Sequence, residues 1–560
     1  MKITRSKSTG KPAGNHAGHA ASPASKAKPR RATAAHPGAD KRFPMRTHPH
    51  LYEINTWVWL DELSARLGHK VTLNSVPDEE WDRFKALGFD IIYLMGIWTR
   101  SEQGRRVART DRDLFGGYDS ALPGWRISDV VGSAYSIQQY VLDPHLGAPR
   151  ELKLLRDKLH ARGMALFVDF VPNHTGLDHP WIESHPEYYV QGSLADFRDN
   201  PTHFLLIDEH GTEKKPLFIA RGRDPNFTPW ADTAQLNYFN PELCQAMIGV
   251  LKTISAAADG VRCDMAMLEL TDIFQKTWNP LLSNWTRPQE EFWKTAIAQT
   301  PGLTFMAEAY SDTEFALQQL GFDYTYDKKI YDDVRDGNTH GVLSHLKGGW
   351  AFQAKTARFL ENHDENRAHH SFGPHRMPAV AALMGSLPGL RFYHQGQLEG
   401  KSLRIPVQLC RSQSESPQSE IKHVYERILT VTNAPAYHSH DWKLLAMQSA
   451  GDDSFQSLIG YVWSTEPASK TDGSVIPDTR LVVVNLGCNP AMASMAMPTD
   501  FSVAPQWEFT DELNGQSYVR DASDLTMHGM FVRLEGAAAH MFSVRPASPE
   551  SAALATVIGT

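Results

Sequence analysis

The chain has little cysteine and no long apolar run. Its 560 residues include only four cysteines, at positions 244, 263, 410 and 488, and no two of them form a CxxC pair. So sparse a set excludes a dense disulfide framework and is typical of a reducing compartment. No stretch of roughly 18 consecutive apolar residues occurs, and the N-terminus lacks the apolar segment of a secretory signal. We therefore expect a cytoplasmic protein with no transmembrane helix and no membrane partner.

The chain also lacks an excess of positive charge. Its 56 Lys and Arg residues face 64 Asp and Glu residues, which gives a formal net charge of -8 at pH 7. This balance offers no overall attraction for nucleic acid. Apolar residues make up 41% of the chain and aromatic residues 10%, which predicts a large core. The length suits one barrel of roughly 250 to 400 residues with an appended domain.

The two ends of the chain differ from the rest. Residues 1–46 are rich in Lys, Arg, Ala, Ser and Pro, and the first acidic residue is Asp40. This composition predicts a disordered basic tail. An organelle transit peptide and a segment that docks on a polyanion are the alternatives. Residues 547–560 are expected to form a second flexible tail.

Eight apolar segments, mostly separated by helical patterns, predict a parallel barrel. Helices are expected over 76–88, 149–162, 241–257 and 288–299. Eight parallel strands favour a closed (β/α)8 TIM barrel, here over residues 47–436. The strands are expected within 52–60, 89–98, 164–170, 259–265, 303–310, 322–326, 357–362 and 390–394.

Two further regions break this alternation. A segment rich in Pro, Asp, His and Trp follows the third strand and is too long for an ordinary loop, so it predicts an inserted subdomain over about 175–235. After about residue 437 the pattern changes to short alternating segments, such as SLIGYVWS and RLVVVNLG. These predict a C-terminal antiparallel β-domain over 437–546.

The segment DGVRCDMAM, residues 259–267, places two charges in an apolar strand. Side chains alternate along a strand, so Arg262 and Asp264 share one face. The guanidinium can then keep the carboxylate ionised and make it a nucleophile. The plainer interpretation is a structural buried ion pair.

Acidic residues recur at the ends of other predicted strands. Asp169, Glu308 and Asp364 each follow or end an apolar segment, as Asp264 does. In a parallel barrel the carboxyl ends of the strands form the active face, so these acids are expected to meet there. Glu308 follows a strongly apolar lead-in and therefore suits acid/base use.

These segments resemble the signature regions of the α-amylase family, glycoside hydrolase family 13. VDFVPNHTG, DGVRCDMAM, FMAEAY and FLENHD occur in the family's order, and GSAYSIQQYVLDPHLG, AQLNYFNPEL and LPGLRFYHQGQLEG extend the resemblance over about 51–546. The resemblance implies a catalytic barrel, an inserted B subdomain and a C-terminal β-sandwich. It also implies that Asp264 is the nucleophile, Glu308 the general acid/base and Asp364 the third carboxylate, which holds sugar hydroxyls.

The resemblance assigns roles to other residues as well. It implies that Arg262 positions Asp264, that His174 and His363 bind the sugar, and that Tyr135 stacks beneath it. It further implies that Asp169, a barrel acid near the arginine, and Arg367, a further subsite residue, also bind the substrate. No cofactor is required for the chemistry. Asn173 matches a calcium ligand of many relatives, and an asparagine that ties the loop backbone is the alternative.

The expected activity is that of a retaining glycoside hydrolase. Its partner would be an oligosaccharide or α-glucan with α-glucosidic bonds, and the chain would be a monomer or small homo-oligomer. Met267 and Leu268 stand where many amylases have Lys-His, which removes a polar contact on the acceptor side. An α-glucan transferase or an α-glucoside isomerase with the same acids is therefore the main alternative, and a non-catalytic sugar-binding or scaffold relative is a minor one.

Overall fold

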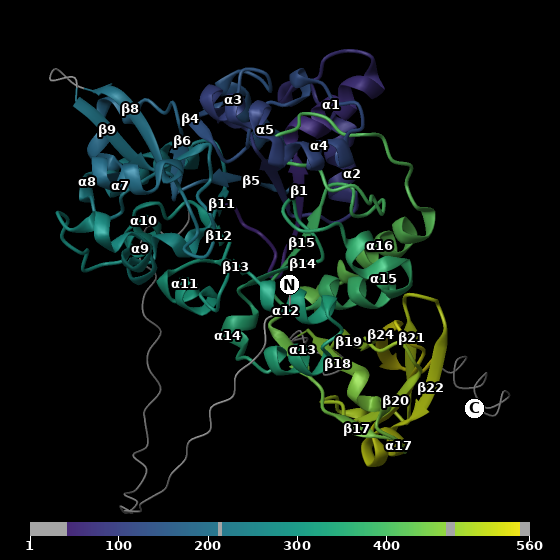
Figure 1. The fold of residues 1–560 in the computed structure, drawn as a ribbon. Helices are drawn as coiled ribbons and strands as arrows, with labels where there is room; N and C mark the ends of the chain where they lie inside the picture. Colours follow the sequence, from purple (N-terminus) through teal and green to yellow (C-terminus); the bar gives the residue numbers. More distant parts are fainter. Residues whose placement is uncertain (1–41, 211–214, 466–476, 549–560) are drawn as a thin grey trace, which may run out of the picture. The chain divides into compact units, whose positions relative to one another are not determined.

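A computed structural model describes residues 42–210, 215–465 and 477–548 (Figure 1). Most of the predicted N-terminal tail and residues 549–560 of the C-terminal tail lie outside the described residues. Residues 42–46, which the prediction assigned to the tail, contact the barrel domain. Arg42 Nη1 donates to Asp323 Oδ1 at 2.6 Å. The ring of Phe43 stacks on that of His160, with the centroids 4.2 Å apart.

Eight parallel strands close into a barrel, which confirms the predicted fold class. The last strand pairs with the first, with His50 opposite Arg391, so the sheet has no free edge. Each predicted segment overlaps one of these strands. They are β1 (His50–Asn55), β2 (Ile91–Met95), β5 (Ala165–Phe170), β11 (Gly260–Cys263), β12 (Thr304–Ala307), β13 (Tyr324–Tyr326), β14 (Thr356–Phe359) and β15 (Leu390–His394).

The first predicted strand, residues 52–60, was wrong in its second half. β1 ends at Asn55, and helix α1 (Thr56–Leu67) begins at the next residue. The side chain of Asn55 accepts a hydrogen bond from Val58 N, as a helix N-cap does. The aromatic and β-branched sequence TWVWL favours a strand by composition alone, but the cap and the burial of Trp57 and Trp59 override that preference.

The second predicted strand, residues 89–98, is also divided. β2 ends at Met95, and Gly96 turns the chain with a φ of +77°. Glycine adopts this left-handed conformation without steric cost. Trp98 then starts β3 (Trp98–Arg100), which pairs with β4 (Ile137–Leu142) outside the barrel.

Amphipathic helices alternate with the barrel strands. In α5 (Pro149–His160), Leu152, Leu155 and Leu159 recur at helical spacing and are buried against the barrel core. The other helices before the insertion are α2 (Asp78–Ala86), α3 (Glu102–Thr110) and α4 (Phe115–Ala121). Those after it are α8 (Pro241–Ser255), α9 (Thr271–Trp278), α10 (Phe292–Gln299), α11 (Glu314–Leu320), α12 (Lys328–Arg335), α13 (Thr339–Leu346), α14 (Trp350–Gln353), α15 (Ala368–Ser386) and α16 (Ser419–Thr432).

Short strands and helices fill the segment between β5 and α8, where the sequence predicted an inserted subdomain. β6 (His174–Gly176) and β10 (Thr233–Gln235) pair at its two ends. β7 (Gln191–Gly192), β8 (Phe204–His210) and β9 (Lys215–Ala220) form a three-stranded sheet, accompanied by α6 (Trp181–Ser184) and α7 (Leu194–Asp199).

Two antiparallel sheets follow the barrel, as predicted for the C-terminal part. One contains β16 (Asp441–Leu444), β18 (Leu458–Ser464), β19 (Thr479–Asn485), β24 (Ala539–Pro546), β21 (Gln506–Asp511) and β22 (Ser517–Asp521). The other contains β17 (Met447–Ser449), β20 (Ala491–Met495) and β23 (Met530–Leu534), and helix α17 (Ala522–His528) lies beside them in sequence. Leu481, Val483, Ala493 and Val532 belong to one apolar cluster that draws on both sheets.

The larger C-terminal sheet contacts the barrel directly. Trp463 Nε1 on β18 donates to Ser386 O at the end of α15, at 2.8 Å. The Tyr461 hydroxyl lies 2.6 Å from the Ser386 hydroxyl. Among the helices that the structure describes, none is long and apolar enough to span a membrane.

Candidate active site

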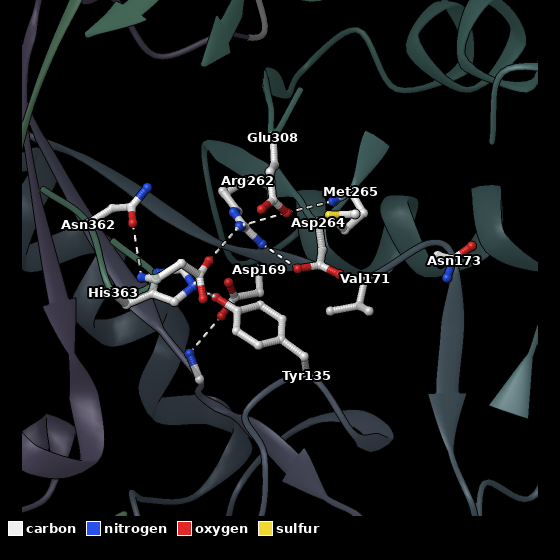
Figure 2. Close-up of polar contacts among 12 residues, drawn as sticks. Tyr135, Asp169, Val171, Asn173, Arg262, Asp264, Met265, Glu308, Asn362 and His363 are labelled. Atoms are coloured by element: carbon white, nitrogen blue, oxygen red, sulfur yellow. Dashed lines mark hydrogen bonds and ion pairs between the residues drawn. The ribbon is translucent and has the colours of Figure 1, made fainter. Parts of the chain in front are cut away.

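Three acidic side chains follow barrel strands at their carboxyl ends. Asp264 comes directly after β11, Glu308 directly after β12, and Asp364 lies in the loop after β14. Figure 2 shows Asp264 and Glu308 next to Arg262, which β11 itself contributes. The parallel strands bring these ends to one face of the barrel, where the residues can act together.

The guanidinium of Arg262 joins the three acids. It is fully buried, and its Nη1 donates to Asp264 Oδ1 at 2.6 Å. Its Nη2 lies 2.8 Å from Glu308 Oε2 and 3.8 Å from Asp364 Oδ2. Arg262 and Asp264 point the same way, as the alternation of side chains along a strand requires. One buried cation therefore faces three carboxylates.

The pKa of Asp264 differs from the simple expectation that Arg262 keeps this carboxylate ionised. Burial raises the pKa of Asp264 to about 7, and the negative charge of Glu308 acts in the same direction, while Arg262 opposes them. The expectation counted only the attraction of the arginine. It omitted desolvation, and it omitted the division of one positive charge among several acids. Near neutral pH, Asp264 is poised between its ionised and protonated forms.

Glu308 is held from several sides. The backbone N–H of Met265 donates to Glu308 Oε2 at 2.7 Å, and the Tyr310 hydroxyl donates to Oε1 at 2.7 Å. Met265 has a φ of 47° and a ψ of 39°, a left-handed conformation that is uncommon for a residue with a side chain. This turn immediately follows the nucleophile candidate and aims a backbone donor at the second acid, so the two carboxyl groups are positioned together.

His363 forms a charged bridge between two acids. Its Nδ1 lies 2.6 Å from Glu53 Oε1, and its Nε2 lies 3.0 Å from Asp364 Oδ2. Burial alone would favour the neutral ring, but Asp364 and Glu53 together raise the pKa of His363 well above its usual 6.5. The imidazolium in turn outweighs burial at Asp364 and holds its pKa low. Asp364 is therefore ionised at neutral pH.

Tyr135 and His174 present groups suited to a sugar. The Tyr135 ring stacks on His363 at a centroid distance of 5.3 Å, and its hydroxyl lies 2.6 Å from His363 Nε2 (Figure 2). His174 Nε2 is buried and has no partner among the residues that the structure describes. Burial lowers the pKa of His174 to about 4, so the ring is neutral. A neutral imidazole with a free nitrogen can bind a hydroxyl group.

Asp169 and Arg367 differ from the expectation that they contact the substrate. Asp169 is fully buried and accepts hydrogen bonds from the Tyr93 hydroxyl and from Gly96 N. Arg367 is only 3% exposed. Its Nη1 donates to Glu361 Oε1 at 2.6 Å and also contacts His394, and its Nη2 donates to the Gln395 carbonyl. Both side chains are buried and make their hydrogen bonds to other groups of the protein.

Two residues at the site escaped the sequence reasoning. Glu53 forms the ion pair with His363, and the Tyr310 hydroxyl donates a hydrogen bond to Glu308. The signal for Glu53 was present, because it is an acid near the carboxyl end of an apolar strand, the same pattern that identified Asp264. Tyr310 carried no such signal, since a tyrosine after a strand is common in a core.

The surroundings of Asn173 do not fit a calcium ion. Its Oδ1 accepts a hydrogen bond from Gln235 Nε2 at 2.9 Å, and its Nδ2 lies 3.2 Å from His174 Nδ1. Within the described ranges, no group of three or more His, Cys, Asp or Glu side chains is arranged to hold a metal. Calcium takes six to eight oxygen ligands, and the side-chain oxygen of Asn173 already accepts a hydrogen bond from Gln235. The Asn173 side-chain amide instead contacts the side chains of Gln235 and His174.

Comparisons with known proteins agree with this geometry. Residues 78–443 match the family model described as the α-amylase catalytic domain. The α-amylase MalA of Haloarcula japonica is 22% identical over 386 residues, which is 68% of this chain and 50% of that protein. The cyclomaltodextrin glucanotransferase of Bacillus sp. strain 38-2 is 26% identical over 244 residues, 42% of this chain and 33% of that protein. The chain thus spans half or less of these two relatives.

A solved structure shows the same fold. The maltogenic α-amylase AmyB of Thermotoga neapolitana superposes with a TM-score of 0.61 and a sequence identity of 17%. The similarity covers 89% of this chain and 98% of that protein, so it extends beyond the barrel into the C-terminal sheets.

Proposed function

The chain belongs to the α-amylase family of glycoside hydrolases, and from this premise we propose that it is a retaining enzyme acting on α-glucosidic bonds. Its substrates would be malto-oligosaccharides, glycogen- or starch-type glucan, or a short α-glucoside. The observation that carries the proposal is the buried guanidinium of Arg262, with Asp264 at 2.6 Å, Glu308 at 2.8 Å and Asp364 at 3.8 Å.

This arrangement suits a double displacement. Glu308 protonates the glycosidic oxygen while Asp264 attacks the anomeric carbon, so the C–O bond to the leaving group breaks and a glycosyl ester forms. Arg262 occupies Asp264 Oδ1, which leaves Oδ2 as the attacking oxygen. Glu308 then takes a proton from water, the hydroxide attacks the same carbon, and Asp264 leaves as a carboxylate.

The spacing of the acids supports retention of configuration. Retaining glycosidases place their two carboxyl groups about 5–5.5 Å apart, whereas inverting enzymes need about 6.5–9.5 Å to admit a water molecule. Asp264 and Glu308 contact the two terminal nitrogens of a single guanidinium, which keeps them close together. Asp364, held ionised by His363, is placed to bind sugar hydroxyls and to stabilise positive charge at the anomeric carbon.

A transferase is a second candidate, because the residues expected on the acceptor side of the site are apolar. Met267 and Leu268, which stand where many amylases have Lys-His, are each 4% exposed and belong to the core. Neither side chain offers a polar contact to an incoming group, so neither selects water over a sugar hydroxyl. A non-catalytic role is disfavoured, since all three acids are present and gathered on one cation.

Product analysis tests both candidates. The purified chain is incubated with maltose, maltoheptaose, glycogen, pullulan, trehalose and sucrose, and the products are separated by chromatography. Release of reducing sugar supports hydrolysis, whereas longer oligosaccharides or isomers without net release support transfer or isomerisation. An Asp264→Asn variant that keeps full activity on the best substrate contradicts the mechanism in either case.

A further inference from the structure

A cavity of about 530 Å³ lies outside the site described above. It is bounded by α8, α9, α10 and the turn η6 (Ala266–Glu269), and none of the three candidate catalytic acids lines it. Aromatic rings form much of its wall, namely those of Tyr238, Phe239, Phe274, Trp285 and Phe292. This volume and this apolar lining are in the range of small-molecule sites, which span roughly 300 to 1,000 Å³.

One acidic side chain lines this cavity without a partner. Glu269 is only 2% exposed, and neither carboxyl oxygen accepts a hydrogen bond from another residue that the structure describes. An unsatisfied buried polar group costs about 1–3 kcal/mol, and a charged one costs more. Native proteins rarely keep such a group unless something else satisfies it.

The charges around the cavity favour a cation as that partner. The titratable groups that interact with Glu269 are Asp264, Tyr238 and Cys263, and none of them is cationic. Burial raises the pKa of Glu269 well above its usual value, and Asp264 adds to the effect.

Two further acidic residues and one basic residue line the cavity. Glu290 and Glu291 line the cavity, and the one basic residue there, Arg287, is already paired with Asp272 at 2.5 Å. No basic side chain of the lining is therefore left to neutralise Glu269.

We propose that this cavity binds a small ammonium ligand with an apolar body. The ammonium N–H groups would bond to both Glu269 oxygens, and the aromatic walls would cover the apolar body and its charge. Binding favours the ionised carboxylate of Glu269, and any proton that this carboxyl loses passes to the solvent buffer while the ligand keeps its own protons.

Calorimetric titration with benzylamine tests the proposal at neutral pH, where this amine is an ammonium ion. Benzyl alcohol, of the same shape but uncharged, serves as the matched ligand. We expect benzylamine to bind at least about tenfold more tightly than the alcohol, as one or two charge-assisted hydrogen bonds imply.

Variants of the chain locate the bound amine. Glu269→Gln should weaken benzylamine binding about tenfold or more, whereas Glu290→Gln at the exposed rim should change it by less than about threefold. Cys244→Phe, which fills the cavity from α8, should abolish binding and provides a second readout if the Glu269 variant folds poorly. Equal binding of amine and alcohol, or unchanged binding by Cys244→Phe, overturns the proposal.

Discussion

The bridge between Glu53 and His363 allows a quantitative test of the site's electrostatics. The Glu53→Gln substitution keeps the shape of the side chain but removes its charge. Both partners are buried, and the Nδ1–Oε1 distance of 2.6 Å is that of a charge-assisted hydrogen bond. The loss of such a bond costs about 1.5–3 kcal/mol. The pKa of His363 should fall as well, because the substitution removes one of the two negative charges that raise it.

The pH dependence of the stability lost in Glu53→Gln follows from the pKa shifts of His363 and Glu53. The pKa of His363 is raised above 6.5, so its contribution to folding is complete below pH 6.5 and is lost as the pH rises through the raised value. The pKa of Glu53 is lowered from 4.5, because the attraction of His363 outweighs burial, so its contribution is complete above pH 4.5 and is lost at lower pH. The difference in unfolding free energy between the wild type and Glu53→Gln should therefore be largest between pH 4.5 and 6.5.

Chemical denaturation over a range of pH measures this difference, and ¹⁵N NMR of the histidine rings follows the titration of His363. The control is Glu62→Gln, since Glu62 is partly exposed and pairs with Lys401 at 2.8 Å. This control should cost less than about 1 kcal/mol, as surface ion pairs do. A pH-independent difference, or a His363 that titrates at or below pH 6.5 in the wild type, would refute the reasoning.

Three further predictions concern the neighbouring residues. The acid limb of the pH profile of kcat/KM should lie near pH 7, because the pKa of Asp264 is raised to about 7 and the nucleophile must be ionised to attack. An acid limb below pH 5 would contradict this. Tyr310→Phe should lower kcat by about tenfold by removing a donor to Glu308, and unchanged kinetics would show that the hydrogen bond is dispensable. Gly96→Ala should lower the free energy of unfolding by about 1–3 kcal/mol, because Gly96 has a φ of +77° and an added Cβ would lie 3.0 Å from Arg100 Nη2. A denaturation curve that matches the wild type would contradict this expectation of backbone strain.

The fold was largely predictable because the barrel strands carry a strong local signal. Segments such as MALFVDF and LRFYH are continuously apolar, as strands buried on both faces must be, and helical spacing separates most of them. The strand prediction was wrong where local composition favours one structure and tertiary contacts stabilise another. TWVWL reads as a strand, yet the cap at Asn55 and the buried tryptophans make it a helix.

The candidate site was predictable in its acids but not in its electrostatics. Strand alternation and strand ends suffice to bring Arg262, Asp264 and Glu308 together. The pKa of Asp264 depends on burial and on how one arginine is shared, neither of which a sequence displays. The position of Arg367 depends on Glu361, six residues earlier in the same loop, and on His394 at the end of β15.

Trapping of the covalent intermediate tests the proposed mechanism most directly. The enzyme is incubated with 5-fluoro-α-D-glucosyl fluoride, whose ring fluorine slows hydrolysis of a glycosyl ester, and is then digested and analysed by tandem mass spectrometry. The account predicts a sugar ester on the peptide that contains Asp264, at that side chain. An ester on Glu308 or Asp364, or no ester on an enzyme that releases fluoride from the reagent, would contradict it.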